Sequence, residues 1–321
     1  MTTILYPFTF TPILKERIWG GTKLKNYLNK PISSENTGES WELSSLPNEV
    51  SVINNGFFKG KNLNELLEQF PEEILGKVVY SRFGKQFPLL FKYLDARENL
   101  SIQLHPNDEL AKKRHNSFGK TEMWYVMQAD ENARLIIGFK ENSSKEEYLQ
   151  KLESNEILSL LNEVPVKKGD VFFLETGTIH AIGAGIVLAE IQQTSDVTYR
   201  IYDWDRVDAN GKERELHTEL AVDAINYQTT SAKKEYTAIV NKSTPVVNCP
   251  YFKTSIISLN DEVLIDKTSD SFMVLMCTEG NFELLFEDKK YTYQTGDTVL
   301  IPAVFTSFML KGIATLVETT I

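Results

Sequence analysis

Short apolar runs separated by polar turn residues dominate the chain and predict a fold built mainly of strands. The runs are rich in Val, Ile, Phe and Tyr, and most are bounded by Gly, Asn, Asp or Pro, which is typical of β-strands. Their dense spacing favours a sandwich or barrel over alternating strands and helices. The clearest predicted strands cover residues 88–94, 100–104, 122–128, 134–139 and 187–192.

Three stretches have the spacing of amphipathic helices instead. Residues 62–70 place four apolar side chains on one face, and Pro71 is expected to end this helix. Ser143 and Ser144 stand three residues before Glu146 and Glu147, a double capping-box pattern that predicts the start of a second helix. A third helix is expected near residues 216–227. We expect the apolar face of each helix to pack against the core.

The chain divides into two parts at a polar, weakly periodic stretch near residues 228–236. We expect residues 1–230 to form one domain with helical insertions and residues 231–321 to form a second domain of strands and turns. In the second part, residues 282–293 (FELLFEDKKYTY) predict a hairpin whose turn lies near Asp288 and Lys289.

Composition and charge limit the classes of partner. The 321 residues include 34 Lys and Arg against 44 Asp and Glu, a net charge of −10, so the chain lacks the basic surplus that favours nucleic acid or anionic membranes. We find neither a long apolar run nor the basic start of a secretion signal. Cys249 and Cys277 have no metal-ligand spacing and suggest free thiols in a reducing cytoplasm. We therefore expect small-molecule partners, no nucleic acid and no membrane.

The first candidate for chemistry combines an amide, an imidazole and a later carboxylate. Gln103 and His105 lie two apart in a predicted strand, so their side chains point to the same face and both can reach one metal ion. Glu122 opens a later strand beside two aromatic residues, where a buried carboxylate needs a partner.

A second candidate is the segment 169–180, GDVFFLETGTIH. It resembles the second motif of the cupin barrels: Gly169, Gly177 and His180 match that motif in register, and Glu175 replaces its usual Pro. In the first cupin motif, two His and a later Glu correspond to Gln103, His105 and Glu122. Together with the strand pattern, the resemblance implies a mainly β fold of two cupin-type (jelly-roll) β-barrels with a small helical portion.

Two imidazoles, a carboxylate and an amide that converge inside a small barrel predict a metal site. This donor set suits Zn²⁺ and leaves room for water or substrate oxygens. The same set contains the two His and one carboxylate of iron oxygenases, and residue types alone do not separate the two metals. The other two histidines, His115 and His217, fit no ligand spacing, and we expect both to be solvated.

Longer segments resemble one family of cupins. FKYLDARENLSIQLHPND at residues 91–108, GKTEMW, GTIHAIGAG and QQTSDVTYRIYDWDR are similar to the type I mannose-6-phosphate isomerases, most closely to their short bacterial form. The similarity extends to RIWGG at residues 17–21 and GESWELS at residues 38–44. The QLHP and SDxxxR elements are specific to the family, whereas GxxH is not. The resemblance implies an enzyme that interconverts mannose 6-phosphate and fructose 6-phosphate with one Zn²⁺ per chain.

The resemblance also implies roles for individual residues. The metal ligands of the family fall on Gln103, His105, Glu122 and His180. The catalytic arginine falls on Arg200, and positions around the substrate fall on Lys92, Ser101, Lys120 and Asp196. Larger relatives carry a Tyr two residues after the zinc-binding His, where this chain has Ile182. A substrate contact assigned to that tyrosine is therefore not expected here.

The chemistry of the reaction agrees with these residue types. Moving a carbonyl between C1 and C2 passes through a cis-enediol(ate), whose developing negative charge must be stabilised. Zn²⁺ supplies this without redox chemistry, and Arg200 offers a permanent planar cation. Lys92 and Lys120 either neutralise the 6-phosphate or coat a surface. Three candidates for the base stay open: Asp196, Glu190 and a zinc-bound water or hydroxide.

The C-terminal part resembles a second, degenerate cupin barrel. Residues 296–305 (GDTVLIPAVF) repeat the Gly-Asp, the strand and the Pro of the motif, but Ser307 stands where a histidine would be expected. We therefore expect residues 1–230 to be the catalytic cupin domain and residues 231–321 to be a barrel without metal.

Two other functions remain as alternatives to the isomerase. The first is an iron-dependent cupin oxygenase that uses the same His and Glu residues. The second is a non-catalytic regulator that binds a sugar phosphate. The expected partner is a small-molecule sugar phosphate, and we expect a monomer or a weak homo-oligomer.

Overall fold

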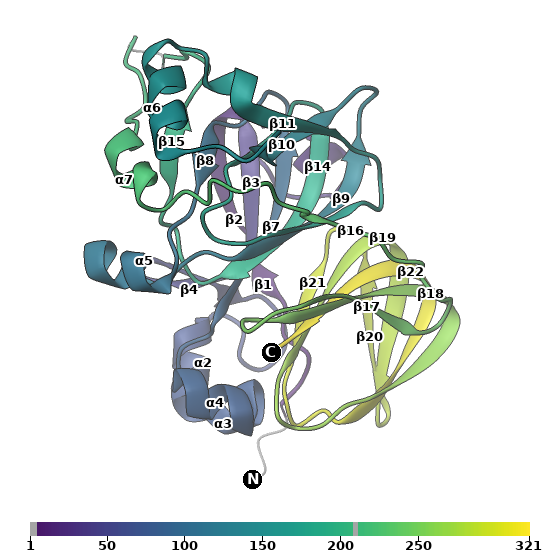
Figure 1. Cartoon of the computed structure of the whole chain (residues 1–321). Helices are drawn as coiled ribbons and strands as arrows, with labels where there is room; N and C mark the ends of the chain where they lie inside the picture. The colour runs from purple at the N-terminus through teal and green to yellow at the C-terminus, as the bar shows by residue number, and fades with distance from the viewer. Residues whose placement is uncertain (1–4, 208–210) are drawn as a thin grey trace.

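A computed structural model of the chain describes residues 5–207 and 211–321, and it has a mainly β fold, as predicted (Figure 1). Within these residues the strands form three large antiparallel sheets and two short pairs, β1 (Phe10–Thr11) with β6 (Val52–Ile53) and β4 (Ser45–Leu46) with β5 (Glu49–Val50). Two large sheets belong to the N-terminal part, and the third forms the C-terminal part, drawn in green and yellow. None of the helices over this described range is long and apolar enough to cross a membrane.

The N-terminal barrel consists of a seven-stranded and a five-stranded sheet. The larger sheet has the order β16 (Lys233–Lys234), β12 (Val171–Leu174), β9 (Glu122–Ala129), β14 (Ile186–Gln193), β7 (Leu89–Ala96), β3 (Thr37–Leu43) and β2 (Ile13–Gly21). The smaller sheet has the order β11 (Leu161–Pro165), β10 (Arg134–Phe139), β13 (His180–Ile182), β8 (Ile102–Leu104) and β15 (Tyr199–Tyr202). The expected strand at 134–139 is β10 without change, and those expected at 122–128 and 187–192 lie within β9 and β14.

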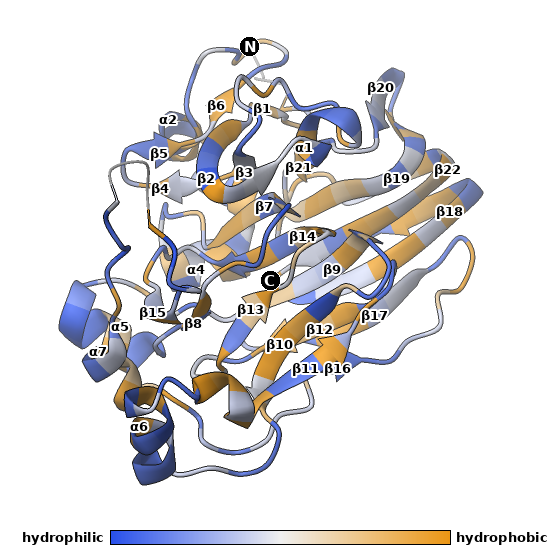
Figure 2. Cartoon of the chain, turned by 90° about the horizontal axis from the view of Figure 1, so that it is seen from above, coloured by the Kyte–Doolittle hydropathy of each residue, from blue (hydrophilic) through white to orange (hydrophobic). Residues whose placement is uncertain are grey.

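Alternation along the central strands separates the interior of this barrel from the core around it. On β9, Trp124 and Val126 belong to the apolar cluster between the two sheets, which also contains Leu135 of β10. Met123 and Tyr125 belong to the cluster on the opposite face. Because Glu122 is two residues before Trp124, β9 directs this carboxylate into the barrel. Figure 2 shows the hydrophobic colour over much of β10, β18 and β22.

The C-terminal sheet has the order β17 (Ser243–Asn248), β18 (Lys253–Asp266), β22 (Ser307–Thr320), β19 (Met273–Phe286) and β20 (Lys289–Gln294), and β21 (Thr298–Ile301) also pairs with β19. The predicted hairpin is formed by β19 and β20, with Phe286 opposite Lys289. Its turn therefore lies one residue earlier than expected, at Glu287 and Asp288.

Both barrels build the Gly-Asp turn of the cupin motif in the same way. Gly169 and Gly296 have φ values of +89° and +93°, which favour glycine. The following carboxylate accepts a hydrogen bond from a backbone N–H three residues earlier, Asp170 from Lys167 at 3.0 Å and Asp297 from Gln294 at 2.8 Å. This repeated turn is the structural basis of the sequence similarity between the two halves.

Helices cover the outer faces of the sheets. α2 (Leu63–Gln69), α3 (Pro71–Leu75) and α4 (Lys77–Phe83) share one apolar core with the seven-stranded sheet and the C-terminal sheet. α6 (Lys145–Glu153), the 3-10 helix η1 (Ile157–Leu160) and α7 (Thr218–Val222) pack on the five-stranded sheet. Two further helices are α1 (Lys23–Asn26) and α5 (Asp108–His115).

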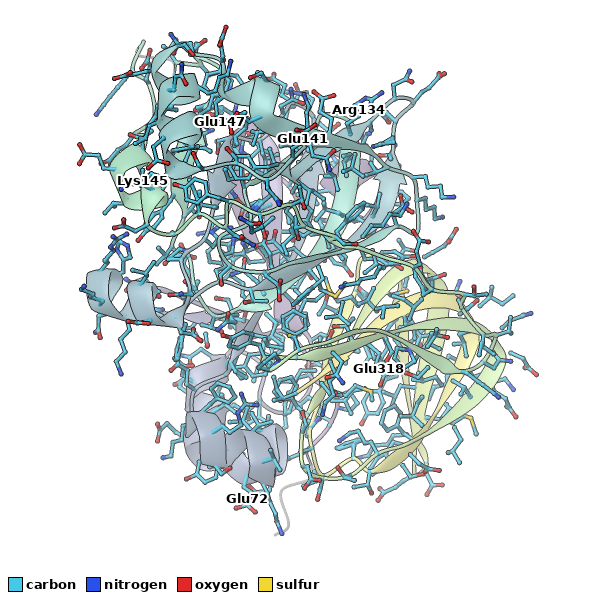
Figure 3. The ribbon with its side chains drawn as sticks, viewed as in Figure 1. Glu72, Arg134, Glu141, Lys145, Glu147 and Glu318 are labelled. Carbon is cyan, nitrogen blue, oxygen red and sulfur yellow. The ribbon has the colours of Figure 1, made fainter. Side chains whose placement is uncertain are left out.

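The helix predictions were partly wrong at their ends. α2 has the expected range and ends before Pro71, as predicted. Pro71 also begins the next helix, α3, because a proline at the first helical position loses no intrahelical hydrogen bond. α6 starts as predicted, with Ser144 Oγ accepting from Glu147 N at 3.2 Å. Figure 3 labels Glu147 on this helix. α7 is shorter than the expected helix near 216–227, because Asn226 N donates to Gly177 O at 2.9 Å and the chain joins the cupin turn there.

Candidate metal centre and substrate cavity

Three buried side chains meet inside the N-terminal barrel and form a candidate metal centre. His105 Nε2 lies 3.5 Å from Glu122 Oε2, and His180 Nε2 lies 3.4 Å from Glu122 Oε1. One ligand atom from each residue can be chosen so that all lie within 4.8 Å of one another. Over residues 5–207 and 211–321, this is the one such group of three or more His, Cys, Asp or Glu side chains.

Hydrogen bonds orient both imidazoles toward Glu122. His105 Nδ1 lies 2.9 Å from the carbonyl oxygen of Val197, and His180 Nδ1 lies 2.8 Å from that of Thr178. Because a carbonyl oxygen only accepts, each Nδ1 carries the proton and each Nε2 presents a lone pair to the site. Glu122 Oε1 and His180 Nε2 are buried without a hydrogen-bond partner. A cation would satisfy both atoms, so these residues fit a metal ion.

Burial keeps both imidazoles in the form that binds a metal. It lowers the pKa of His180 to about 4, and together with the charge of Lys120 it holds the pKa of His105 well below its usual range. Burial also raises the pKa of Glu122, an effect that Lys120 opposes. The Lys120 ammonium lies 3.0 Å from Glu122 Oε2 and 3.1 Å from His105 Nε2.

Gln103 and Arg200 stand beside His180 on the five-stranded sheet. His180 on β13 is paired with Gln103 on β8, and Gln103 is paired in turn with Arg200 on β15. Opposed residues on neighbouring antiparallel strands point to the same face, so the three side chains form a row. Ser101 links the row, because its Oγ lies 3.3 Å from Gln103 Oε1 and 3.3 Å from Arg200 Nε.

A cavity of about 710 Å³ opens in front of this row. The predicted site residues that line it are Gln103, His180, Arg200, Lys92, Ser101, Lys120 and Asp196. His105 and Glu122 are only 2% and 1% exposed and lie behind its wall. The fold therefore brings the predicted site residues to one place, with Asp196 as their exposed member.

The two lysines expected near the substrate are buried in ion pairs. Besides the contacts of Lys120, Lys92 Nζ lies 2.9 Å from Glu190 Oε1, and Trp124 Nε1 donates to Glu190 Oε2 at 2.9 Å. Burial alone would raise the pKa of Glu190, but Lys92 and Lys120 outweigh it and lower that pKa. Glu190 is therefore a carboxylate with both oxygens engaged.

Strands β2 and β3 supply a part of the cavity wall that the sequence motifs did not predict. Arg17 Nε donates to Glu39 Oε1 at 2.6 Å, and Trp41 Nε1 donates to Glu39 Oε2 at 2.6 Å. Lys92 Nζ lies 4.0 Å from Glu39 Oε2 and 5.2 Å from the centre of the Trp41 ring. Glu39 and Trp41 are two apart on one strand, and that shared face was the signal that could have placed them beside the site.

Comparisons with known proteins identify the family. The catalytic-domain model of type I phosphomannose isomerase matches residues 8–141, and the cupin-domain model of mannose-6-phosphate isomerase matches residues 242–321. The mannose-6-phosphate isomerase ManA of Bacillus subtilis is 38% identical over 314 residues, which are 96% of each chain. The chain belongs to the type I phosphomannose isomerase family.

Further relatives agree with membership of the type I phosphomannose isomerase family. The mannose-6-phosphate isomerase of Streptococcus mutans is 37% identical over 302 residues, 93% of each chain. The crystal structure of the mannose 6-phosphate isomerase from Bacillus subtilis superposes with a TM-score of 0.91 at 37% identity, covering 99% of this chain and all of that chain. The prediction of a cupin-type fold is confirmed.

The two remaining histidines differ in their surroundings within this phosphomannose isomerase fold. His115 is exposed, as expected, although its Nε2 lies 2.8 Å from Tyr199 OH. His217 is half-buried instead of solvated, and its Nδ1 accepts a hydrogen bond of 3.2 Å from the backbone N of Arg200. Spacing along the sequence could not reveal this contact, because it joins the strand β15 to the segment before α7.

Proposed function

We propose that the chain is a zinc-dependent aldose-ketose isomerase that interconverts mannose 6-phosphate and fructose 6-phosphate through a cis-enediol(ate). The reaction is supported by family membership, since the relatives from Bacillus subtilis and Streptococcus mutans are named mannose-6-phosphate isomerases. One observation carries the metal dependence: Glu122 Oε1 and His180 Nε2 are buried, unpartnered and 3.4 Å apart beside the cavity.

The residues proposed to hold the metal are Gln103, His105, Glu122 and His180. Two neutral imidazoles with oxygen donors are a ligand set that zinc accepts, and the isomerisation involves no net redox change that would require iron. When bound, zinc stabilises the negative charge that develops on the substrate oxygens. The predicted stoichiometry is one Zn²⁺ per chain.

Arg200 is the proposed catalytic residue. Its Nε donates to Ser101 Oγ at 3.3 Å and its Nη1 donates to Glu215 O at 2.8 Å, which fixes the plane of the guanidinium. Its Nη2 has no hydrogen-bond partner among the described residues and is free to bind a substrate oxygen in the cavity. A fixed donor aimed at the developing charge lowers the barrier because it needs no reorganisation during the reaction.

Lys92, Ser101, Lys120 and Asp196 are the proposed substrate-binding residues. An ammonium has three N–H donors, so Lys92 and Lys120 retain donors for substrate after pairing with their carboxylates. Of the two side chains considered as base, Glu190 has both oxygens engaged by Lys92 and Trp124. Within the described chain, the Asp196 carboxylate makes no hydrogen bond, which favours Asp196 for the proton transfer.

We propose that the two barrels have different roles. Residues 1–230 form the catalytic cupin domain, and residues 231–321 form a metal-free barrel that packs against it, apart from β16 (Lys233–Lys234), which pairs with β12 of the first barrel. The shared apolar core of the two parts supports a structural role for the second barrel. A cytoplasmic location and a monomeric or weakly associating state remain predictions from the sequence.

Metal removal and replacement test this function against its alternatives. Purified protein treated with a chelator is expected to lose the conversion of mannose 6-phosphate to fructose 6-phosphate in a coupled assay, and one equivalent of zinc is expected to restore it. Restoration by iron alone, with substrate-dependent oxygen uptake, would favour the oxygenase. Binding of mannose 6-phosphate without formation of fructose 6-phosphate would favour the regulator.

A further inference from the structure

One residue, His217, makes two hydrogen bonds with the main chain of Arg200. The backbone N of Arg200 donates to His217 Nδ1 at 3.2 Å, and the backbone N of His217 donates to Arg200 O at 2.7 Å. His217 immediately precedes α7, whereas Arg200 lies in the edge strand β15. An edge strand has unpaired backbone groups on one side, and here His217 takes the place of a neighbouring strand.

The same segment also contacts the side chain of Arg200. Glu215 O accepts the hydrogen bond from Arg200 Nη1 at 2.8 Å, two residues before His217. The segment from Glu215 to His217 therefore holds the arginine at its backbone and at its guanidinium. Ser101 Oγ, at 3.3 Å from Nε, holds the other edge of the guanidinium.

An ion-pair cluster anchors the start of this segment. Arg214 Nε donates to Asp203 Oδ2 at 2.7 Å, and Arg206 Nη2 donates to Asp203 Oδ1 at 2.6 Å. Asp203 is buried and directly follows β15. The next two residues, Trp204 and Asp205, have φ values of +60° and +52°, a strained conformation that persists only where the surroundings impose it. Arg214, the residue before Glu215, is therefore tied to the end of β15.

The imidazole of His217 is itself held in place by aromatic contacts. Its ring stacks on that of Tyr199 with centroids 6.3 Å apart and an interplanar angle of 29°. Tyr199 precedes Arg200, and its side chain is fully buried. The ring of His217 is therefore oriented by packing, which aims Nδ1 at the backbone N–H of Arg200.

We propose that His217 is a positioning residue for Arg200, acting through the acceptor atom Nδ1 to direct the guanidinium into the cavity. The inference rests on the proposed function, because it matters only if Arg200 serves the reaction. An Nδ1 that accepts a hydrogen bond has no proton, so the neutral ring carries its proton on Nε2. Only a residue with an acceptor at the same place can substitute for it.

Three substitutions of His217 distinguish the effect of its acceptor atom from the effect of its aromatic ring. In His217→Asn, the amide oxygen can take the place of Nδ1. His217→Phe keeps an aromatic ring against Tyr199 but removes the acceptor, and His217→Ala removes both. The matched control is His115→Ala, which removes the imidazole on the other side of Tyr199 without touching Arg200. For each variant we would measure kcat, KM for mannose 6-phosphate, bound zinc and the melting temperature.

We expect kcat to fall when the hydrogen-bond acceptor at position 217 is removed, whether or not an aromatic ring is kept there. A small misplacement of a catalytic group can cost up to about 100-fold in rate, so we expect kcat to fall about tenfold or more in the Phe and Ala variants. KM and bound zinc should stay close to wild type. The Asn variant should keep kcat within about threefold of wild type, and His115→Ala should match wild type.

A double-mutant cycle tests whether His217 acts through Arg200. In an Arg200→Ala background, His217→Phe should cause no further loss of kcat, because the group that it positions is gone. A full additional loss in that background would overturn the proposal, as would loss of bound zinc in His217→Phe.

The outcomes also separate this inference from the proposed function. Wild-type kcat in His217→Phe, with an inactive Arg200→Ala, would overturn the positioning role and leave the proposed function standing. Wild-type kcat in Arg200→Ala would contradict the proposed function itself. If His217→Ala does not fold, the comparison of the Asn and Phe variants still shows whether kcat depends on the acceptor atom.

Discussion

Lys92 and Glu190 form a buried ion pair across two central strands of the barrel, with Lys92 Nζ 2.9 Å from Glu190 Oε1. The two residues are directly opposed in β7 and β14, and their side chains are only 9% and 4% exposed. Trp124 and Glu39 extend the pair into a network that includes the wall of the cavity. Breaking one member of such a pair leaves an uncompensated charge in the interior.

Lys92→Met is expected to destabilise the metal-free protein strongly. Loss of a partner from a buried pair costs about 3 kcal/mol or more in the free energy of unfolding, which urea denaturation would measure. The control is Lys85→Met, because Lys85 pairs with Glu68 at the surface, where the side chains are 44% and 65% exposed. The control should change stability little. Equal effects of the two substitutions would show that the buried pair has no special role.

Arg200→Ala is expected to remove most turnover while zinc remains bound. Loss of one fixed donor to the developing charge lowers kcat by about 100-fold or more in other enzymes. Among the described residues, no hydrogen bond or ion pair joins Arg200 to His105, Glu122 or His180, so the zinc content by elemental analysis should equal that of wild type. An unchanged kcat would contradict the catalytic role of this arginine.

His180→Ala is expected to abolish metal-dependent stabilisation. A metal that binds only the folded state at 100 times its Kd adds about 2.7 kcal/mol to the free energy of unfolding. Zinc should therefore raise the melting temperature of the chelator-treated wild-type protein and not that of His180→Ala. His115→Ala, which alters an exposed imidazole, should keep the full shift. A zinc-induced shift of wild-type size in His180→Ala would place the metal elsewhere.

Glu318→Gln is expected to stabilise the protein at neutral pH. Glu318 lies in the C-terminal sheet (Figure 3), where burial raises its pKa above the usual value and Ser243 opposes the shift only partly. The folded state then binds the proton more tightly than the unfolded state, so this residue's contribution to stability falls as pH rises through its folded-state pKa. Gln is neutral at every pH, so the gain in the free energy of unfolding from Glu318→Gln should be present at pH 7.

Acid conditions and an exposed glutamate provide the controls for that substitution. The advantage of Glu318→Gln should vanish below the pKa of an ordinary glutamate, where Glu318 is protonated in both states. Glu72→Gln, at the exposed first turn of α3, should give no gain, because a carboxylate is favourable near a helix N-terminus. A pH-independent effect of Glu318→Gln would argue against burial as the cause.

Much of the candidate site could be predicted because its residues lie in short motifs with fixed spacing. Gln103 and His105 share a face of one strand, and His180 follows two motif glycines, so local geometry alone brings each toward the barrel interior. The strands that carry Glu122 and Glu190 were also predicted, since both are long apolar runs. These features depend on neighbouring residues in the sequence.

The features that could not be predicted from the sequence depend on contacts between segments that are distant in the chain. The pairing of Lys92 with Glu190 follows from the register of β7 and β14, and the contact of Arg17 with Glu39 follows from that of β2 and β3. The contact of His217 with the main chain of Arg200 joins the segment before α7 to the edge of β15. The end of the third predicted helix was missed for a similar reason, because Asn226, four residues after α7, bonds with the distant Gly177.

The proposed function requires a metal-dependent proton transfer between C1 and C2 of a sugar phosphate at the site of His105, Glu122 and His180. NMR of mannose 6-phosphate incubated with the protein in D₂O tests this claim most directly. We predict deuterium at C2 of mannose 6-phosphate or at C1 of fructose 6-phosphate, and its loss when a chelator removes the metal. Conversion over many turnovers without any deuterium, or deuterium exchange that persists in the metal-free protein, would contradict the account.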